Sequence, residues 1–200
     1  MRAVSSVIVW LLALGVSQPA LAHSPIKGIG DFYNGLLHPV LVPAHLLVLI
    51  ALGLLIAQKG IFQNRIAFPA FFTASLVGLI IAWFSASGEL QLVLLGVAAV
   101  VGLVVASNWP VGRYVSATAA ALAGLLICID STQETLSGRE KLVTFIGTGV
   151  GVNLLFVYSI GVVDYFSKKD WQKIGVRVIG SWVAASSLLV LALSYSVNTR

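Results

Sequence analysis

The chain has 200 residues, of which 58% are hydrophobic and 10% are charged, and its mean hydropathy is +1.00. Soluble domains are usually about 45–50% apolar and about 25% charged, so this composition excludes a soluble enzyme and predicts a membrane protein. A single cysteine excludes an internal disulfide and a zinc ribbon. The net charge of +5 comes from Lys and Arg scattered over the loops, which excludes a nucleic-acid-binding stripe.

Residues 1–22 are predicted to be a secretory signal peptide. Arg2 precedes a short apolar core at 7–16, and Ala20-Leu21-Ala22 is a small-x-small cleavage site. The alternative is an uncleaved first helix, although the apolar core is short for a span of about 20 residues. Cleavage would place His23 at the mature N-terminus, where the α-amino group and the imidazole could together chelate a metal ion. The simpler interpretation is a histidine in a flexible tail.

Residues 23–200 are predicted to form a single domain, an all-α bundle of six transmembrane helices. Short segments that hold most of the polar residues, Gly and Pro separate the apolar runs. The third run is the shortest. The expected spans are 36–57, 67–85, 90–106, 111–129, 142–166 and 174–195.

Small residues inside the spans predict close helix packing. Gly96 and Gly102 lie in the third span, and Gly147, Gly149 and Gly151 lie in the fifth. The same glycine-rich stretch contains Asn153. It indicates either ordinary helix packing or a break that exposes backbone carbonyls to an ion, and packing is the simpler interpretation.

The distribution of charge predicts a multi-pass membrane protein with its mature N-terminus outside, because cytoplasmic loops are enriched in Lys and Arg. Five of the seven acids and the three histidines then lie outside or near the outer end of the first span, where they could attract cations. The alternative is that acids simply avoid the basic side. The basic residues expected inside are Lys59, Arg65, Arg113, Lys168, Lys169, Lys173 and Arg177, and those expected outside are Lys27, Arg139, Lys141 and Arg200.

A polar stripe marks the first span, because Asp31, His38 and His45 are spaced seven apart and lie on one face of a helix. On a straight helix His38 and His45 would be about 10.5 Å apart along the axis, too far for one ion with metal–nitrogen bonds of about 2.0–2.1 Å. Pro39 and Pro43 lie between them and could bend the helix enough to close this gap. Otherwise the histidines are successive stations on a path.

Ionisable residues within a span are candidates for function. The structural alternative is that His38 caps the helix at the membrane interface and that His45 makes a buried hydrogen bond to a neighbouring span. Asp164, near the end of the fifth span, is expected to pair with Lys168.

Two segments, 22–24 and 35–49, resemble the HupE/UreJ family of nickel and cobalt permeases, which are small inner-membrane proteins. The resemblance implies a cleaved signal, about six spans and a first mature span in which His-Pro is followed, after a short gap, by Asp-His-Leu-Leu. His38 and His45 match the two histidines, whereas Ala44 stands in place of the aspartate. A second His-rich segment of the family would fall at 125–132, where this sequence has no histidine.

Other side chains could complete a site for nickel, cobalt, copper or zinc. Asp130 or Glu134 could supply a carboxylate and Cys128 a thiolate, although Cys128 is more simply a small buried hydrophobe and Asp130 a loop acid or a helix cap. No nucleophile elbow or phosphate loop is present, so no catalytic or cofactor-binding residue and no enzyme activity is expected. The predicted metal-binding residues are His38, His45, Asp31, His23 and Asp130.

Two functions are consistent with these features. The first is a permease that takes a divalent transition metal ion from the outer compartment through the His-bearing first span, as the family resemblance implies. The second is a non-enzymatic membrane subunit, or a metal-delivery or assembly factor, packed against a larger membrane complex or against further copies of itself. The scarcity of charges inside the spans favours the second, because a route for a doubly charged ion needs a polar lining. Lipid is the expected environment in both cases, and nucleic acid is not an expected partner.

Overall fold

The structure, a computed structural model, describes residues 28–85, 90–132 and 136–198, and all regular secondary structure in these residues is α-helical, as predicted. The predicted signal peptide, His23 and Glu134 lie outside the described residues. The helices are α2 (Asp31–Leu41), α3 (Pro43–Gln58), α4 (Ala67–Phe84), α5 (Gln91–Ser107), α6 (Arg113–Asp130), α7 (Gly138–Phe166) and α8 (Asp170–Asn198).

Among the described residues, four helices, namely α4, α6, α7 and α8, are long and apolar enough to cross a membrane. Helices α2 and α3 pass the same test only when they are taken together as one broken span, and α5 is a shorter apolar helix of 17 residues. A 17-residue helix is about 26 Å long, somewhat less than the hydrocarbon thickness of about 30 Å. The multi-pass all-α architecture is therefore confirmed, whereas the expected count of six spans is not, since the described residues contain four such helices, or five if the bent pair is one span.

Helices α7 and α8 begin before the predicted spans. The first starts at Gly138 and not at 142, and the second starts at Asp170 and not at 174. Their first turns are rich in charged residues, which hydropathy assigns to loops. Such residues still form helical backbone hydrogen bonds, and acids such as Glu140 and Asp170 in a first turn are favoured by the helix dipole.

The first predicted span is broken. Helices α2 and α3 meet at Val42 with a bend of 67°, and Val42 has the extended dihedral angles φ −91° and ψ 110°. The sequence explains the break, because a residue that precedes proline is pushed out of the helical region, and Pro43 follows. Pro43 then begins α3 at a position where its missing N–H costs nothing.

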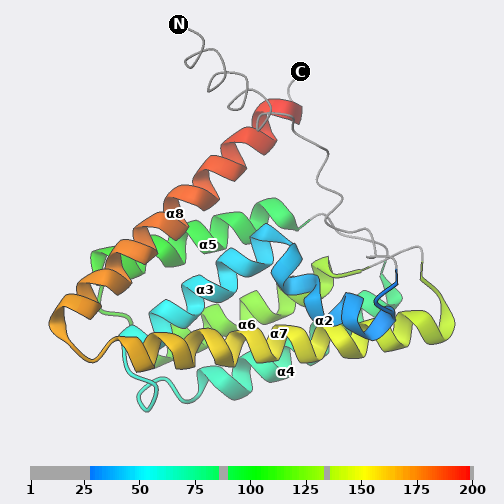
Figure 1. The fold of residues 1–200 in the computed structure, drawn as a ribbon, viewed down its shortest axis with the longest axis horizontal. Coiled ribbons are helices and arrows are strands. Elements are labelled where there is room, and N and C mark those ends of the chain that lie inside the picture. The colour runs from blue at the N-terminus through cyan, green and yellow to red at the C-terminus, as the bar shows by residue number, and fades with distance from the viewer. Residues whose placement is uncertain (1–27, 86–89, 133–135, 199–200) are drawn as a thin grey trace, which may run out of the picture.

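Helix α3 occupies the centre of the bundle. It contacts α5, α6, α7 and α8, and eleven of its sixteen residues are buried. In Figure 1, α5 and α8 lie on one side of α3, whereas α4, α6 and α7 lie on its other side. The closest helix pairs are α4 with α6, α2 with α7, and α5 with α8. A helix that is apolar all round suits such a buried central position.

Glycines allow the close approach of α2 to α7. A methyl group on Gly147 would collide with the carbonyl of Phe32, and one on Gly151 would collide with the carbonyl of Leu36. Contacts at Gly102, which faces Gly180 and Ala184 of α8, and at Gly149, which faces Leu79, confirm the predicted packing. The prediction for Gly96 is wrong, since no other atom lies within 4 Å of the position that its Cβ would take. Spacing alone does not tell which glycine faces a neighbour.

Helix α7 continues without interruption through its glycine-rich stretch. The amide of Asn153 donates to the carbonyl of Gly149 at 2.8 Å and to the hydroxyl of Ser75 on α4 at 3.1 Å. The interpretation of Asn153 as part of ordinary helix packing is therefore confirmed.

Candidate metal site

The bend at Val42 brings two histidines of the first span side by side. The ring centroids of His38 and His45 are 5.2 Å apart, with an angle of 64° between the ring planes. Both side chains are buried, His38 with 4% and His45 with 0% of its surface exposed. Since a straight helix would hold them about 10.5 Å apart along its axis, the irregularity expected from Pro39 and Pro43 is what closes the gap.

His45 also contacts a carboxylate from another helix. Its Nε2 lies 2.9 Å from Oδ2 of Asp130, the last residue of α6, and both side chains are buried. This is the buried hydrogen bond to a neighbouring span that was the structural alternative for His45. The sequence contains no local signal for the pair, because its members are 85 positions apart.

Asp130 caps a third helix. Its Oδ1 accepts a hydrogen bond of 2.8 Å from the backbone N–H of Leu90, which directly precedes α5. A carboxylate at the C-terminal end of its own helix is disfavoured by that helix's dipole, and the N-terminus of α5 offsets this effect. The expectation that Asp130 caps a nearby helix end is therefore confirmed, and one carboxylate connects α3, α5 and α6.

The remaining predicted residues lie apart from this cluster. Asp31 begins α2, about two turns before His38. Cys128 is a free, fully buried thiol, which matches its interpretation as a small core residue. Within residues 28–85, 90–132 and 136–198, no three His, Cys, Asp or Glu side chains converge in a way that could hold a metal ion.

The histidines lie at one end of the bundle, and Lys59, Lys168 and Arg177 lie at the opposite, basic end. Lys59 Nζ donates to the side-chain and main-chain oxygens of Asn108, and Arg177 Nε donates to the carbonyl of Ala106, so α3, α5 and α8 meet at one end. Asp130 and Leu90 lie at the other end, because α5 runs from Leu90 towards the basic end and α6 returns from there to Asp130. Near the basic end, Lys168 pairs with Asp164 at 2.7 Å, as predicted.

Beyond His45, the buried part of α3 is apolar. Its fully or almost fully buried side chains include Val48, Leu49, Leu52, Leu55 and Ile56. A packed hydrophobic core therefore follows His45 along α3.

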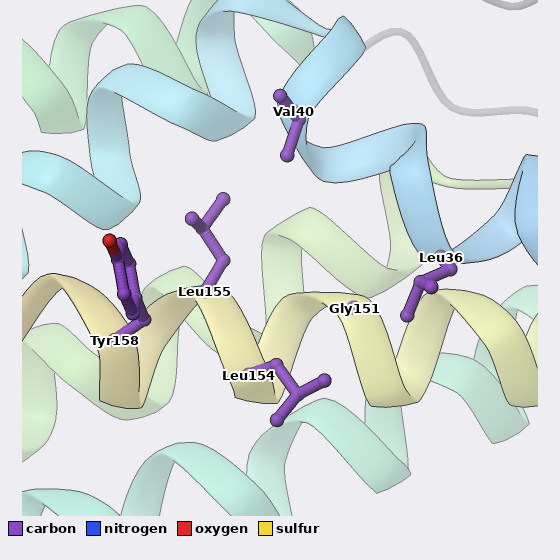
Figure 2. A pocket seen from close by; sticks show the side chains of 6 residues that line it. All are labelled: Leu36, Val40, Gly151, Leu154, Leu155 and Tyr158. Atoms are coloured by element: carbon purple, nitrogen blue, oxygen red, sulfur yellow. The ribbon is translucent and has the colours of Figure 1, made fainter.

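An apolar groove of about 400 Å³ lies next to the bend, between α2 and α7 (Figure 2). Leu154 and Tyr158 on its rim are 60% and 68% exposed. Because no His, Asp, Glu or Cys lines the groove, it does not extend the metal site. Its lining residues are Leu36, Val40, Gly151, Leu154, Leu155 and Tyr158.

A family model described as "HupE / UreJ protein" matches residues 11–190. The chain belongs to the HupE/UreJ family. This agrees with the resemblance of the segment around His38 and His45. The chain has no match among curated proteins and none among solved structures.

In this HupE/UreJ protein the sequence indicated that Asp130 could cap a helix end but did not identify its partner, the backbone N–H of Leu90. A backbone donor leaves no trace in the residue types. The prolines, by contrast, were a visible signal for the bend that pairs the histidines.

Proposed function

We propose that this HupE/UreJ protein is an inner-membrane permease for a divalent transition metal ion, nickel or cobalt, and that His38 and His45 bind the ion at the outer face. The observation that carries the proposal is the pair of buried imidazoles at the break in the first span. Two ionisable rings within a membrane segment are costly to bury, and they are retained where they serve a function.

The spacing of the rings suits a shared ion. Two imidazoles that bind one tetrahedral ion through bonds of about 2.1 Å have ring centroids about 5 Å apart, and those of His38 and His45 are 5.2 Å apart. Imidazole is also a preferred ligand of nickel, cobalt, copper and zinc. The Asp130 carboxylate beside His45 adds a negative charge that favours a cation.

A small set of protein ligands suits a transported ion better than a resident one. Structural zinc sites are closed by four protein ligands, whereas no three candidate ligands converge within the described part of this chain. Water would complete the coordination shell of an ion held by two imidazoles. Transport requires binding that is favourable enough for entry and weak enough for release.

The orientation supports uptake from outside. Cytoplasmic loops are enriched in Lys and Arg, and the histidine site lies at the end opposite Lys59, Lys168 and Arg177. The site then faces the outer compartment. Asp31 at the start of α2, and His23 if it is the mature N-terminus, would add donors at the entrance.

A second function, a metal-delivery or assembly subunit of a larger membrane complex, is favoured by one observation. The buried residues of α3 that follow His45 are apolar, and a divalent ion cannot cross such a core without a polar lining. In that case the same two imidazoles would bind the ion and pass it to a partner on the same side of the membrane.

The test is nickel and cobalt uptake into proteoliposomes loaded with a metal-sensitive dye, with binding measured on the same protein in detergent. We expect His38→Gln and His45→Gln to abolish both uptake and binding. Ser187→Ala, which alters a buried polar residue on α8, is the control and should change neither. Binding by the wild type without uptake would overturn the permease and support the delivery subunit. Binding that is unaffected by either histidine substitution would overturn both.

A further inference from the structure

We propose that Asp130 is a positioning residue that holds His45 as the Nε2–H tautomer, so that the metal ion binds to Nδ1 of His45. The inference rests on the proposed function, because it assigns the nitrogen that binds the ion. It also divides the roles within the cluster, since Asp130 acts through His45 and does not touch the ion.

Asp130 faces two different groups. Its Oδ1 accepts from the N–H of Leu90 at 2.8 Å, and its Oδ2 lies 2.9 Å from Nε2 of His45. A backbone N–H can only donate, and an ionised carboxylate can only accept. Nε2 of His45 is therefore the donor of the second hydrogen bond.

A neutral imidazole carries its hydrogen on one nitrogen and a lone pair on the other. With the hydrogen on Nε2, the lone pair of His45 is on Nδ1, and a metal ion can bind only where a lone pair is present. Histidines that bind metals commonly donate their other ring N–H to a carboxylate, which fixes the tautomer and the ring orientation. The His45–Asp130 contact has this form.

Both carboxylate oxygens of Asp130 are already engaged within the protein. Oδ1 accepts from the N–H of Leu90 and Oδ2 lies against Nε2 of His45. In the proposed arrangement the carboxylate therefore supports the ring, and the imidazoles of His38 and His45 are the ligands.

Replacing Asp130 with Asn tests this assignment, because an amide has only one oxygen. If that oxygen keeps its bond to the N–H of Leu90, the amide NH₂ faces His45 and must donate to Nε2. His45 would then carry its hydrogen on Nδ1, which blocks the nitrogen proposed to bind metal. The substitution should thus reverse the tautomer while it removes no proposed ligand.

The experiment measures the ¹⁵N chemical shifts of His45 in the metal-free, full-length protein in detergent, above the usual imidazole pKa of about 6.5. His23→Gln and His38→Gln leave His45 as the only labelled histidine. We expect an unprotonated Nδ1 with Asp130 and a protonated Nδ1 in Asp130→Asn. In a protein that retains His38, Asp130→Asn should weaken nickel binding about 10–100-fold. Asp164→Asn, which alters an exposed carboxylate paired with Lys168, is the matched control and should change neither quantity.

A protonated Nδ1 in the protein that keeps Asp130 would overturn the inference, and this measurement requires no substitution of Asp130. Unchanged nickel affinity in a folded Asp130→Asn protein would overturn it as well. Because the tautomer is measured without metal, its result does not depend on transport. Failure of the proposed function itself would be seen separately, because nickel binding would then be unchanged in His45→Gln.

Discussion

The imidazole of His45 and the carboxylate of Asp130, from positions 85 apart in the sequence, meet in a buried hydrogen bond of 2.9 Å. The same carboxylate accepts the backbone N–H of Leu90. One side chain therefore fastens the central helix α3 and the start of α5 to the end of α6. This arrangement makes Asp130 important for stability, in addition to its proposed role in metal binding.

We expect Asp130→Ala to lower the free energy of unfolding by about 2–3 kcal/mol, because the substitution removes a shared acceptor from the buried Nε2 of His45 and the half-buried N–H of Leu90, and a buried donor left unsatisfied costs about 1–3 kcal/mol. The rate at which the buried thiol of Cys128 reacts with a maleimide dye during heating would report unfolding, since Cys128 is the only cysteine. Asp170→Ala, which removes an exposed ion pair with Lys173, should have little effect. Equal melting temperatures for Asp130→Ala and the wild type would contradict this expectation.

The glycine contact between α2 and α7 gives a second prediction. Gly151→Ala places a methyl group against the carbonyl of Leu36 and should destabilise the protein by about 1–3 kcal/mol through overpacking. Gly161→Ala on the same helix is the matched control, because the added methyl group would meet no neighbouring element within 4 Å. Alanine also favours a helix over glycine by about 1 kcal/mol. The same thiol-reactivity assay would compare them, and equal stabilities would show that α2 does not pack closely on α7.

The bend at Val42 gives a prediction about metal affinity. Pro43→Ala removes the steric restriction that holds Val42 in the extended region, so α2 and α3 can align and the two imidazoles can separate. We expect nickel binding to weaken about tenfold, equivalent to about 1.4 kcal/mol, although both histidines remain. Pro69→Ala, in the first turn of α4, should leave the affinity unchanged. Titration of nickel against the detergent-purified proteins measures both, and an unaltered affinity in Pro43→Ala would show that the proline is dispensable for the site.

Lys59 at the end of α3 gives a prediction about pH. Burial lowers the pKa of its ammonium group below the ordinary value of 10.5. Between the lowered value and 10.5, the unfolded chain binds more protons than the folded one, so the contribution of Lys59 to stability rises as the pH rises through this window. In Lys59→Met this contribution is absent, and the unfolding free energy should increase less with pH in that range. Unfolding curves over this pH range for both proteins test the sign, and identical slopes would contradict it.

The sequence was sufficient for the broad architecture because the bilayer sets the length of an apolar helix. It also predicted the bend, since Pro39 and Pro43 act locally on the backbone, and the pairing of Lys168 with Asp164, which lie one helical turn apart. In each of these cases the physical cause lies within a few residues of its effect.

The contact between His45 and Asp130 could not be predicted in this way. Helix α3 is apolar on all sides, so its sequence does not indicate which helix covers which face. The failed prediction at Gly96 has the same origin, because the rotation of α5 about its axis decides whether a glycine meets a neighbour. Such contacts depend on the arrangement of the whole bundle.

The order of synthesis gives the His45–Asp130 contact a further consequence. Ribosomes add about 5–20 residues per second, so Asp130 is made on the order of ten seconds after His45. During this interval the imidazole of His45 lacks the carboxylate that later contacts it. The contact between α3 and α6 can therefore form only after Asp130 has been synthesised, so this part of the bundle's centre is completed late although α3 is made early.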